Sequence, residues 1–209
     1  MKMTLQIIWT KNATWKLKGY PRYWIKWLRL ICSQSRYKML YFLIWILFTI
    51  LLLGFTLARS HPYRFPRFLA FESILSLIFL NAAVWFLDPF SFLQVFSWIC
   101  LVGSILLVGY GFFLIKTKGH PEGDFEDTTT LITSGVYSYI RHPLYTSLIL
   151  FSLGAFLKDP SFLGMGLVIT TVIGVYLTAR IEEGHNLERF GEAYQNYVEQ
   201  TKRFIPKIF

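Results

Sequence analysis

The chain has 209 residues, which is enough for one domain with a sizeable core. It is 54% hydrophobic and 19% aromatic, and only 16% of its residues are charged. A soluble domain is about 45–50% apolar and about 25% charged, so this composition argues against an ordinary soluble protein and favours one whose outer surface faces lipid.

The first 38 residues carry much of the net charge of +9. They contain nine basic residues and no acidic residue, and four tryptophans and three tyrosines lie between the charges. Such a mixture of cations and aromatic rings suits a segment that lies on anionic lipid. We therefore expect residues 1–38 to be an interfacial segment, with no nucleic acid as a partner. A disordered basic tail stays open as an alternative for residues 1–19.

Three apolar runs follow, and each has the ~20 residues needed to cross about 30 Å of hydrocarbon. They cover residues 39–58, 68–87 and 90–115, and within them Glu72 is the one charged side chain. A polar loop that contains glycine and proline then covers residues 116–127. We expect the three runs to be transmembrane helices.

The next apolar run is short. Residues 144–157 are followed at once by Lys158, Asp159 and Pro160, and 14 helical residues reach only roughly 21 Å. The helix therefore either starts earlier, through residues 136–140, or reaches only part of the depth of the membrane.

Residues 161–179 then return as a fuller span, so residues 144–179 are expected to form a helical hairpin that turns at Asp159-Pro160. The segments at its open ends, residues 129–143 and 180–200, must then lie on the same side of the membrane. This topology brings together two polar motifs that are far apart in the sequence.

Together these runs predict an all-α integral membrane bundle of about five transmembrane helices. A basic interfacial segment (residues 1–38) precedes a membrane domain (residues 39–209), which ends in an amphipathic helix. With five spans, the N-terminal segment and the open ends of the hairpin lie on opposite sides of the membrane. The basic residues near the spans favour a cytosolic location for the open ends.

Residues 180–200 have the pattern of that amphipathic helix. Glu183 lies four residues before its apolar stripe, and Glu182 lies on the adjacent face. His185 shares that spacing, but one histidine and two acids lack the convergent ligands of a metal site, so we expect no bound metal. The stripe has spacings of three, four and three residues and consists of Leu187, Phe190, Tyr194 and Tyr197.

The other open end reads TTLITSGVYSYIRHPLY over residues 129–145. His142 is biased toward extended backbone because Pro143 follows it, and Pro143 suits the first turn of a helix. Free backbone N–H groups there and the guanidinium of Arg141 would face polar or anionic atoms of a ligand. The alternative is that these residues and Tyr145 only anchor a helix among the lipid headgroups.

The pairing of the two ends favours a binding site over an anchor. S-adenosylmethionine would suit it, because a sulfonium and an amino group are bound well by carboxylates and aromatic faces. The carboxylate and the adenine of the same molecule suit an arginine and backbone donors.

The same residues carry a family resemblance. The block at 129–145, followed by EEGHNLERFGEAYQNYVEQTKRFIP over residues 182–206, resembles the isoprenylcysteine carboxyl methyltransferase family, whose wider group includes phospholipid N-methyltransferases. The resemblance covers about residues 116–209, which it implies to be the cofactor-binding part. By this resemblance Glu182 holds the polar end of the cofactor, and the pocket is lined by Thr129, Thr130, Leu131, Ile132, Tyr137, His142, Pro143, Leu144 and Tyr145.

One departure from the family pattern concerns the substrate. The prenylcysteine enzymes have an arginine four residues before the first glutamate that contacts the substrate, and this chain has Thr178 there. Arg180 is the nearest replacement, so we take it as the candidate substrate-binding residue.

The resemblance implies a membrane methyltransferase that uses S-adenosylmethionine and acts on a lipophilic acceptor, either a prenylcysteine-like carboxylate or a lipid headgroup. Membrane lipids and that acceptor are the expected partners. We take Arg141 and Glu183 as candidate catalytic residues, with Glu183 as the general base if the acceptor is an amine.

The alternative function is an NADPH-dependent membrane reductase of the sterol reductase type. Those enzymes share a similar helical layout and a related Arg-His-Pro turn, but they usually place a glutamate three residues after the tyrosine of that turn. This chain has Leu148 at that position, which favours the methyltransferase.

Overall fold

The computed structural model describes residues 39–56, 64–86, 90–120 and 128–207, together with the backbone of two short strands near the N-terminus. The chain divides into two compact units, Met1–Ile46 and Leu47–Phe209. The division falls inside the helix Met39–Thr56, and the domain boundary predicted at residue 38 stays a prediction.

The first unit contains an antiparallel pair of strands, β1 (Ile7–Thr10) and β2 (Thr14–Leu17). Their β-branched and aromatic residues favour extended backbone, and Trp9 pairs with Trp15 in the register of the two strands. The sequence did not predict these strands. Most of the interfacial segment expected over residues 1–38 lies outside the described residues.

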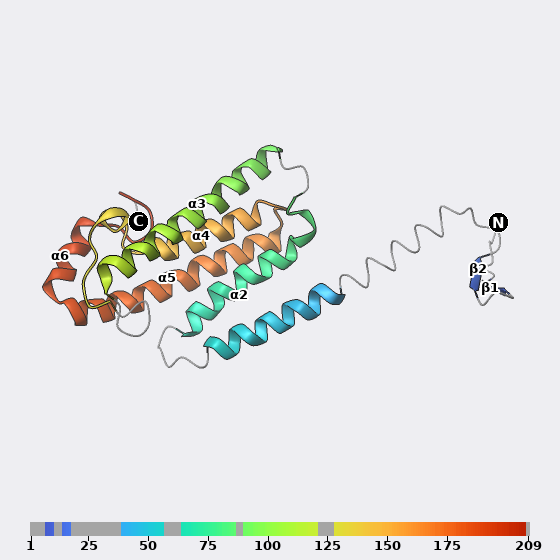
Figure 1. The fold of residues 1–209 in the computed structure, drawn as a ribbon, viewed down its shortest axis with the longest axis horizontal. Coiled ribbons are helices and arrows are strands. Elements are labelled where there is room, and N and C mark those ends of the chain that lie inside the picture. The colour runs from blue at the N-terminus through green and yellow to red at the C-terminus, as the bar shows by residue number, and fades with distance from the viewer. Residues whose placement is uncertain are drawn as a thin grey trace. The chain divides into compact units, whose positions relative to one another are not determined.

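The second unit is a bundle of helices that lie side by side, as Figure 1 shows, so the predicted all-α class is confirmed. Short helical turns join the long helices: η1 (Ala82–Val84), η2 (Ile115–Gly119) and η3 (Gly135–Ser138). Helix α3 packs on α4, and α2 packs on α5. The long elements are α2 (Arg64–Leu80), α3 (Phe92–Leu114), α4 (Pro143–Phe156), α5 (Phe162–Phe190) and α6 (Glu192–Gln200).

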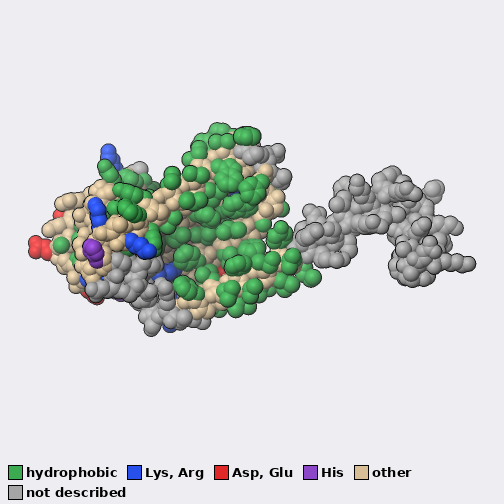
Figure 2. All heavy atoms as spheres, in the orientation of Figure 1, with side chains coloured by type: hydrophobic (Ala, Val, Ile, Leu, Met, Phe, Trp, Pro, Cys, Tyr) green, Lys and Arg blue, Asp and Glu red, His purple; other side chains and the backbone are tan. Residues whose placement is uncertain are grey.

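Three helices in the described part of the chain are long and apolar enough to cross a membrane: Met39–Thr56, Phe92–Gly119 and Phe162–Phe190. Helices α2 and α4 are shorter, with 17 and 14 residues, so a total of five spans stays a prediction. In Figure 2 hydrophobic side chains cover the helices in view, and most charged side chains gather at the end that carries α6.

The predicted span over residues 68–87 is displaced in the structure. Helix α2 starts at Arg64 and ends at Leu80, because Asn81 leaves the helix and its Nδ2 donates to the carbonyl of Ala155 at 2.7 Å. Within α2, Glu72 Oε1 accepts a hydrogen bond from Thr49 Oγ1 at 3.0 Å, so the one carboxylate in this apolar region is held between helices.

The predicted hairpin is present. Helix α4 has Pro143 in its first turn and ends at Phe156, and α5 begins just after Asp159-Pro160. Lys158 at the turn is buried: its Nζ donates to Gln94 Oε1 at 3.0 Å and lies 3.7 Å from the centre of the Trp98 ring. Gln94 Nε2 in turn donates to the carbonyl of Lys158 at 2.9 Å, so the turn of the hairpin is fastened to α3.

The predicted amphipathic C-terminal helix is present as α6 (Glu192–Gln200), but its predicted bounds, residues 180–200, are wrong. Helix α5 continues without interruption to Phe190, and the chain then turns at Gly191, whose φ of +56° is a backbone conformation that favours glycine. Helix α6 follows. Glu182 and Glu183 therefore lie on the extension of α5, which fixes their direction relative to the bundle.

The segment after α6 returns to the turn before α4. Lys202 bridges Ile140 in parallel, the N–H of Arg141 donates to the carbonyl of Lys202 at 2.8 Å, and the N–H of His142 donates to the carbonyl of Arg203 at 3.1 Å. This short ladder holds the backbone of Arg141 and His142 in place beside α5.

Close packing between α2 and α5 generates the first prediction. A Cβ atom on Gly174 would lie 2.6 Å from the carbonyl oxygen of Pro66 and 3.0 Å from the backbone nitrogen of Ala70, whereas one on Gly166 would meet nothing within 4 Å. We expect Gly174→Ala to destabilise the protein by about 1–3 kcal/mol, because the helices must separate. Thermal unfolding in detergent measures it. Gly166→Ala on the same helix is the control, and equal midpoints for the two variants would contradict this packing.

Candidate functional site

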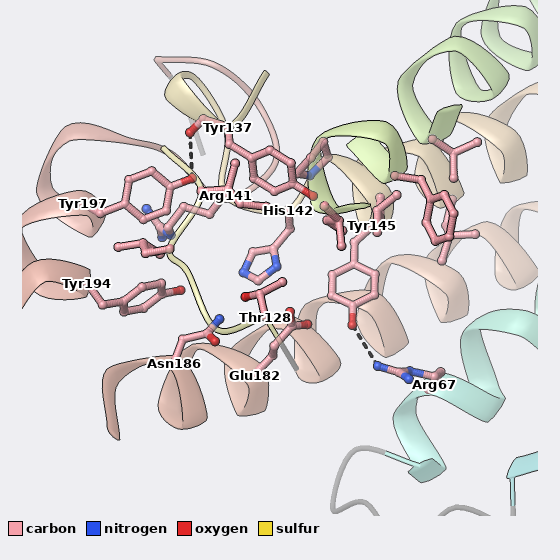
Figure 3. A pocket seen from close by; sticks show the side chains of 18 of the residues that line it. Arg67, Thr128, Tyr137, Arg141, His142, Tyr145, Glu182, Asn186, Tyr194 and Tyr197 are labelled. Carbon is pink, nitrogen blue, oxygen red and sulfur yellow. Dashed lines mark hydrogen bonds between the residues drawn. The ribbon is translucent and has the colours of Figure 1, made fainter. Parts of the chain in front are cut away.

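A cavity of about 360 Å³ lies where the open end of the hairpin meets α2, α3 and α6. Figure 3 shows its side chains pointing toward a common space from several elements. The polar or ionisable members are Arg67, Thr128, Tyr137, Arg141, His142, Tyr145, Glu182, Asn186, Tyr194 and Tyr197. The other members are apolar: Phe55, Phe71, Val108, Phe112, Ile115, Leu131, Ile132, Pro143, Leu144, Leu148 and Phe190.

Tyr194 and Tyr197 lie at one end of the cavity, the tyrosine end, and Tyr137 joins them through its backbone carbonyl (Figure 3). Tyr197 donates its hydroxyl to the carbonyl of Tyr137 at 2.6 Å, and the rings of Tyr194 and Tyr197 are 6.0 Å apart. Burial raises the pKa of all three phenols, and the negative charge of Glu182 adds to this for Tyr137. The hydroxyls therefore stay protonated at neutral pH and act as neutral hydrogen-bonding groups.

His142 lies in the middle of the cavity, between the tyrosine end and Tyr145 (Figure 3). It is the residue immediately before α4, its side chain is buried, and its ring stacks on that of Tyr145 at 5.5 Å. Glu182 reaches the same space from α5. An aromatic pair and a carboxylate thus face each other from the two open ends of the hairpin, as the topology predicted.

Glu183 lies next to this space but does not line it. Its carboxylate accepts hydrogen bonds from Arg141 Nε at 2.9 Å and from two nitrogens of Arg203, and it lies 3.2 Å from His142 Nε2. An ionised carboxylate can only accept, so the Nε2 of His142 carries a proton. We refer to Glu183, Arg141, His142 and Arg203 as the Glu183 cluster.

Arg141 is held by backbone as well. Its Nη1 donates to the carbonyls of Val198 at 3.2 Å and Thr201 at 2.6 Å, in addition to the bond from Nε to Glu183. Only 8% of its side chain is exposed. The guanidinium therefore joins the turn before α4 to the end of α6, and the chain itself supplies acceptors for its charge.

The opposite end of the cavity combines a cation with apolar side chains. Arg67 of α2 donates from Nη2 to the hydroxyl of Tyr145 at 3.0 Å, as the dashed line in Figure 3 marks. Phe71, one turn further along α2, lines the cavity with Phe55 and Leu148. Tyr145 and Leu148 pack against the cluster that contains Ala70 of α2, so apolar side chains lie beside Arg67 at this end, which we call the apolar end.

Most of the predicted pocket residues line the cavity, and four predicted site residues do not. Glu183 lies behind the wall, as described, and Arg180 is exposed and outside the lining. Thr129 and Thr130 are also exposed, with their backbone N–H groups bonded to the carbonyl of Gly119, and Thr128 lines the cavity instead. The predicted site residues that line the cavity are Leu131, Ile132, Tyr137, Arg141, His142, Pro143, Leu144, Tyr145 and Glu182.

Sequence reasoning missed two groups of residues. Tyr194 and Tyr197 were assigned to an apolar stripe, but their hydroxyls belong to the polar end of the cavity. Arg67 and Arg203 carried no local signal, because each meets its partners only through the packing of elements far apart in the sequence. Asn186, four residues after Glu182, could have been found from helical spacing.

The chain is similar to known methyltransferases. The model of the phospholipid methyltransferase family matches residues 92–193. The protein-S-isoprenylcysteine O-methyltransferase of Schizosaccharomyces pombe is 31% identical over 80 residues, which cover 37% of this chain and 34% of that protein. The enzymes of the same name from Mus musculus and Rattus norvegicus are each 30% identical over 129 residues, 56% of this chain and 44% of theirs.

The chain thus spans between a third and a half of the length of these curated relatives. No solved structure matches it. The matched residues include Tyr137, His142, Tyr145 and Glu182, and the matches confirm the family resemblance that the motifs predicted.

The Glu183 cluster generates the second prediction. We expect Glu183→Gln to destabilise the protein by about 2–4 kcal/mol, somewhat less than the loss of a fully buried pair, because the Glu183 side chain is 14% exposed. Thermal unfolding in detergent measures the change. Glu188→Gln, an exposed position on the same helix, should leave the midpoint unchanged. If both variants unfold like the wild type, the cluster does not hold the site together.

Proposed function

We propose that this chain transfers a methyl group from S-adenosylmethionine to a lipophilic acceptor. It would then be a membrane methyltransferase that resembles the isoprenylcysteine carboxyl methyltransferases. The observation that carries the proposal is the cavity itself. It places a carboxylate, Glu182, opposite the stacked rings of His142 and Tyr145, within the region that matches methyltransferases.

The donor set fits this cofactor. A sulfonium and an ammonium are bound by a carboxylate and by the faces of aromatic rings, which Glu182, Tyr145 and the tyrosine end provide. Neutral phenols and the Asn186 amide suit a carboxylate and an adenine. A cavity of about 360 Å³ lies within the range of small-molecule sites, about 300–1,000 Å³.

S-adenosylmethionine supplies, when bound, an electrophilic methyl group that a nucleophile takes in one in-line displacement. The chain then has to bind and orient the cofactor and the acceptor, and it has to exclude water from the site. Tyr137 and His142 suit the last task, since they line the cavity with only 8% and 5% of their surfaces exposed. His142 also keeps its orientation, because its backbone N–H, its Nε2 and its ring face each have a partner.

We assign Glu183 and Arg141 to positioning rather than to proton transfer. Glu183 accepts from Arg141, His142 and Arg203 and lies behind the cavity wall, so it is poorly placed to take a proton from an acceptor. A carboxylate or thiolate acceptor needs no base. For an amine acceptor, Glu182 and His142 are the candidates, because both line the cavity.

The apolar end of the cavity supports a lipophilic acceptor. Phe55, Phe71 and Leu148 suit a prenyl or acyl chain, and the relatives reported above act on a prenylated cysteine or belong to a phospholipid methyltransferase family by name. Both classes of relative are methyltransferases, which favours transfer over the reductase alternative. We place this end of the bundle in the cytosol, where the cofactor is available.

The test of the proposed function is binding followed by transfer. Calorimetry in detergent should show saturable binding of S-adenosylmethionine and of S-adenosylhomocysteine, because the cavity offers a carboxylate and aromatic faces. A tritiated-methyl assay with prenylcysteine derivatives and with phospholipid extracts should then give a labelled lipophilic product. Saturable binding of NADPH, with no binding of S-adenosylmethionine or S-adenosylhomocysteine, would overturn the proposal in favour of a reductase.

Glu182 is tested separately. Glu182→Gln should raise the dissociation constant of S-adenosylmethionine by about tenfold, since a charge-assisted contact to a cation is worth about 1.5–3 kcal/mol, while the thermal midpoint changes little. Glu188→Gln serves again as the matched control. Wild-type affinity in Glu182→Gln would mean that the cofactor is held elsewhere.

A further inference from the structure

We propose that Arg67 recognises an anionic oxygen group, a carboxylate or a phosphate, on the acceptor. The inference rests on the proposed function and names the specificity residue of the acceptor end of the same cavity. Arg67 belongs to α2 and lies outside residues 92–193, the region that matches the family.

The position of Arg67 links it to the centre of the cavity. Its Nη2 donates to the hydroxyl of Tyr145 at 3.0 Å, and the ring of Tyr145 stacks on His142. In Figure 3 Arg67 and Tyr145 lie on one side of His142, and Tyr194 and Tyr197 lie on the other. A group bound at Arg67 is therefore separated from the tyrosine end by the histidine.

The surroundings of Arg67 fit an amphiphile. Phe71 lies four residues further along α2 and lines the cavity with Phe55 and Leu148. A guanidinium beside such a wall provides a planar pair of donors for a carboxylate or phosphate, and the apolar side chains provide contact for an attached hydrocarbon chain. The two together match one molecule that has an anionic head and an apolar tail.

The other arginines near the site are less suited to this role. Arg203 does not line the cavity, and Arg141 lies on the tyrosine side of His142 in Figure 3, away from Arg67. Arg180, the residue predicted from the sequence, is exposed and outside the lining. Thr178, at the position where the prenylcysteine enzymes have a substrate-binding arginine, is buried and donates to the carbonyl of Gly174.

The experiment measures charge preference without a methyl donor. Purified full-length protein in detergent is titrated with an S-prenylated cysteine that has a free carboxylate and with its neutral amide. A second pair consists of a phosphatidic acid and an uncharged diacylglycerol. The first pair tests a carboxylate source and the second a phosphate source.

Wild-type protein should prefer the anionic member of at least one pair by about tenfold, and Arg67→Gln should lose most of that preference. Arg67→Lys should keep part of it, because the charge remains. Arg67→Met, which keeps an apolar stem, is a second neutral variant in case the glutamine variant folds poorly. Arg64→Gln, at an exposed position on α2, is the matched control and should behave as the wild type does.

Two further readouts separate this inference from the proposed function. The dissociation constant of S-adenosylhomocysteine should stay within about twofold in Arg67→Gln, and the transfer assay should show a KM for the acceptor raised about tenfold with kcat little changed. A wild type with no charge preference, or an Arg67→Gln variant that keeps it, overturns the role of Arg67 alone. A wild type that fails to bind S-adenosylhomocysteine overturns the proposed function.

Discussion

The carboxylate of Glu183 joins three parts of the chain that are far apart in the sequence. It accepts from Arg141 and His142 in the turn before α4, lies on the extension of α5, and is paired with Arg203 after α6. Two guanidinium groups and an imidazole around one partly buried carboxylate offset the cost of removing the charges from water. The direction of His142, and with it the shape of the cavity, depends on this arrangement, although Glu183 itself contributes no surface to the cavity.

The hairpin explains why a polar cluster of this kind is possible beside a membrane. Because α4 and α5 turn at one end of the bundle, their other ends lie together, and the buried Lys158 with Gln94 and Trp98 fixes the turn to α3. Charged side chains gather mainly at the end that carries α6, and hydrophobic side chains cover the rest of the helices in view. That separation is what the absence of water from a bilayer requires.

The sequence predicted the helical class, the hairpin and the meeting of its open ends, because these follow from the lengths of apolar runs and from proline positions. The turn motif pointed to His142 and Tyr145 as residues facing a ligand, and only the family resemblance pointed to Glu182; all three line the cavity. The sequence could not place Arg67, since which residue of α2 faces α4 is decided by packing that has no local pattern. The sequence analysis also divided α5 wrongly, because periodicity does not show that a helix continues past the end of a span. It interpreted Glu183 as an acid that faces the site, whereas Glu183 belongs to the Glu183 cluster and does not line the cavity.

The pairing of Lys202 and Arg203 with residues 139–142 has a consequence for the order of events during synthesis. The helices, the turn before α4 and Glu183 all leave the ribosome before Arg203 does, and until then the carbonyls of Lys202 and Arg203 that accept from Arg141 and His142 are missing. Until Lys202 and Arg203 are in place, the backbone N–H groups of Arg141 and His142 lack these two acceptors. The cavity is therefore completed late, and a chain that ended before Lys202 would lack the backbone acceptors of Arg141 and His142.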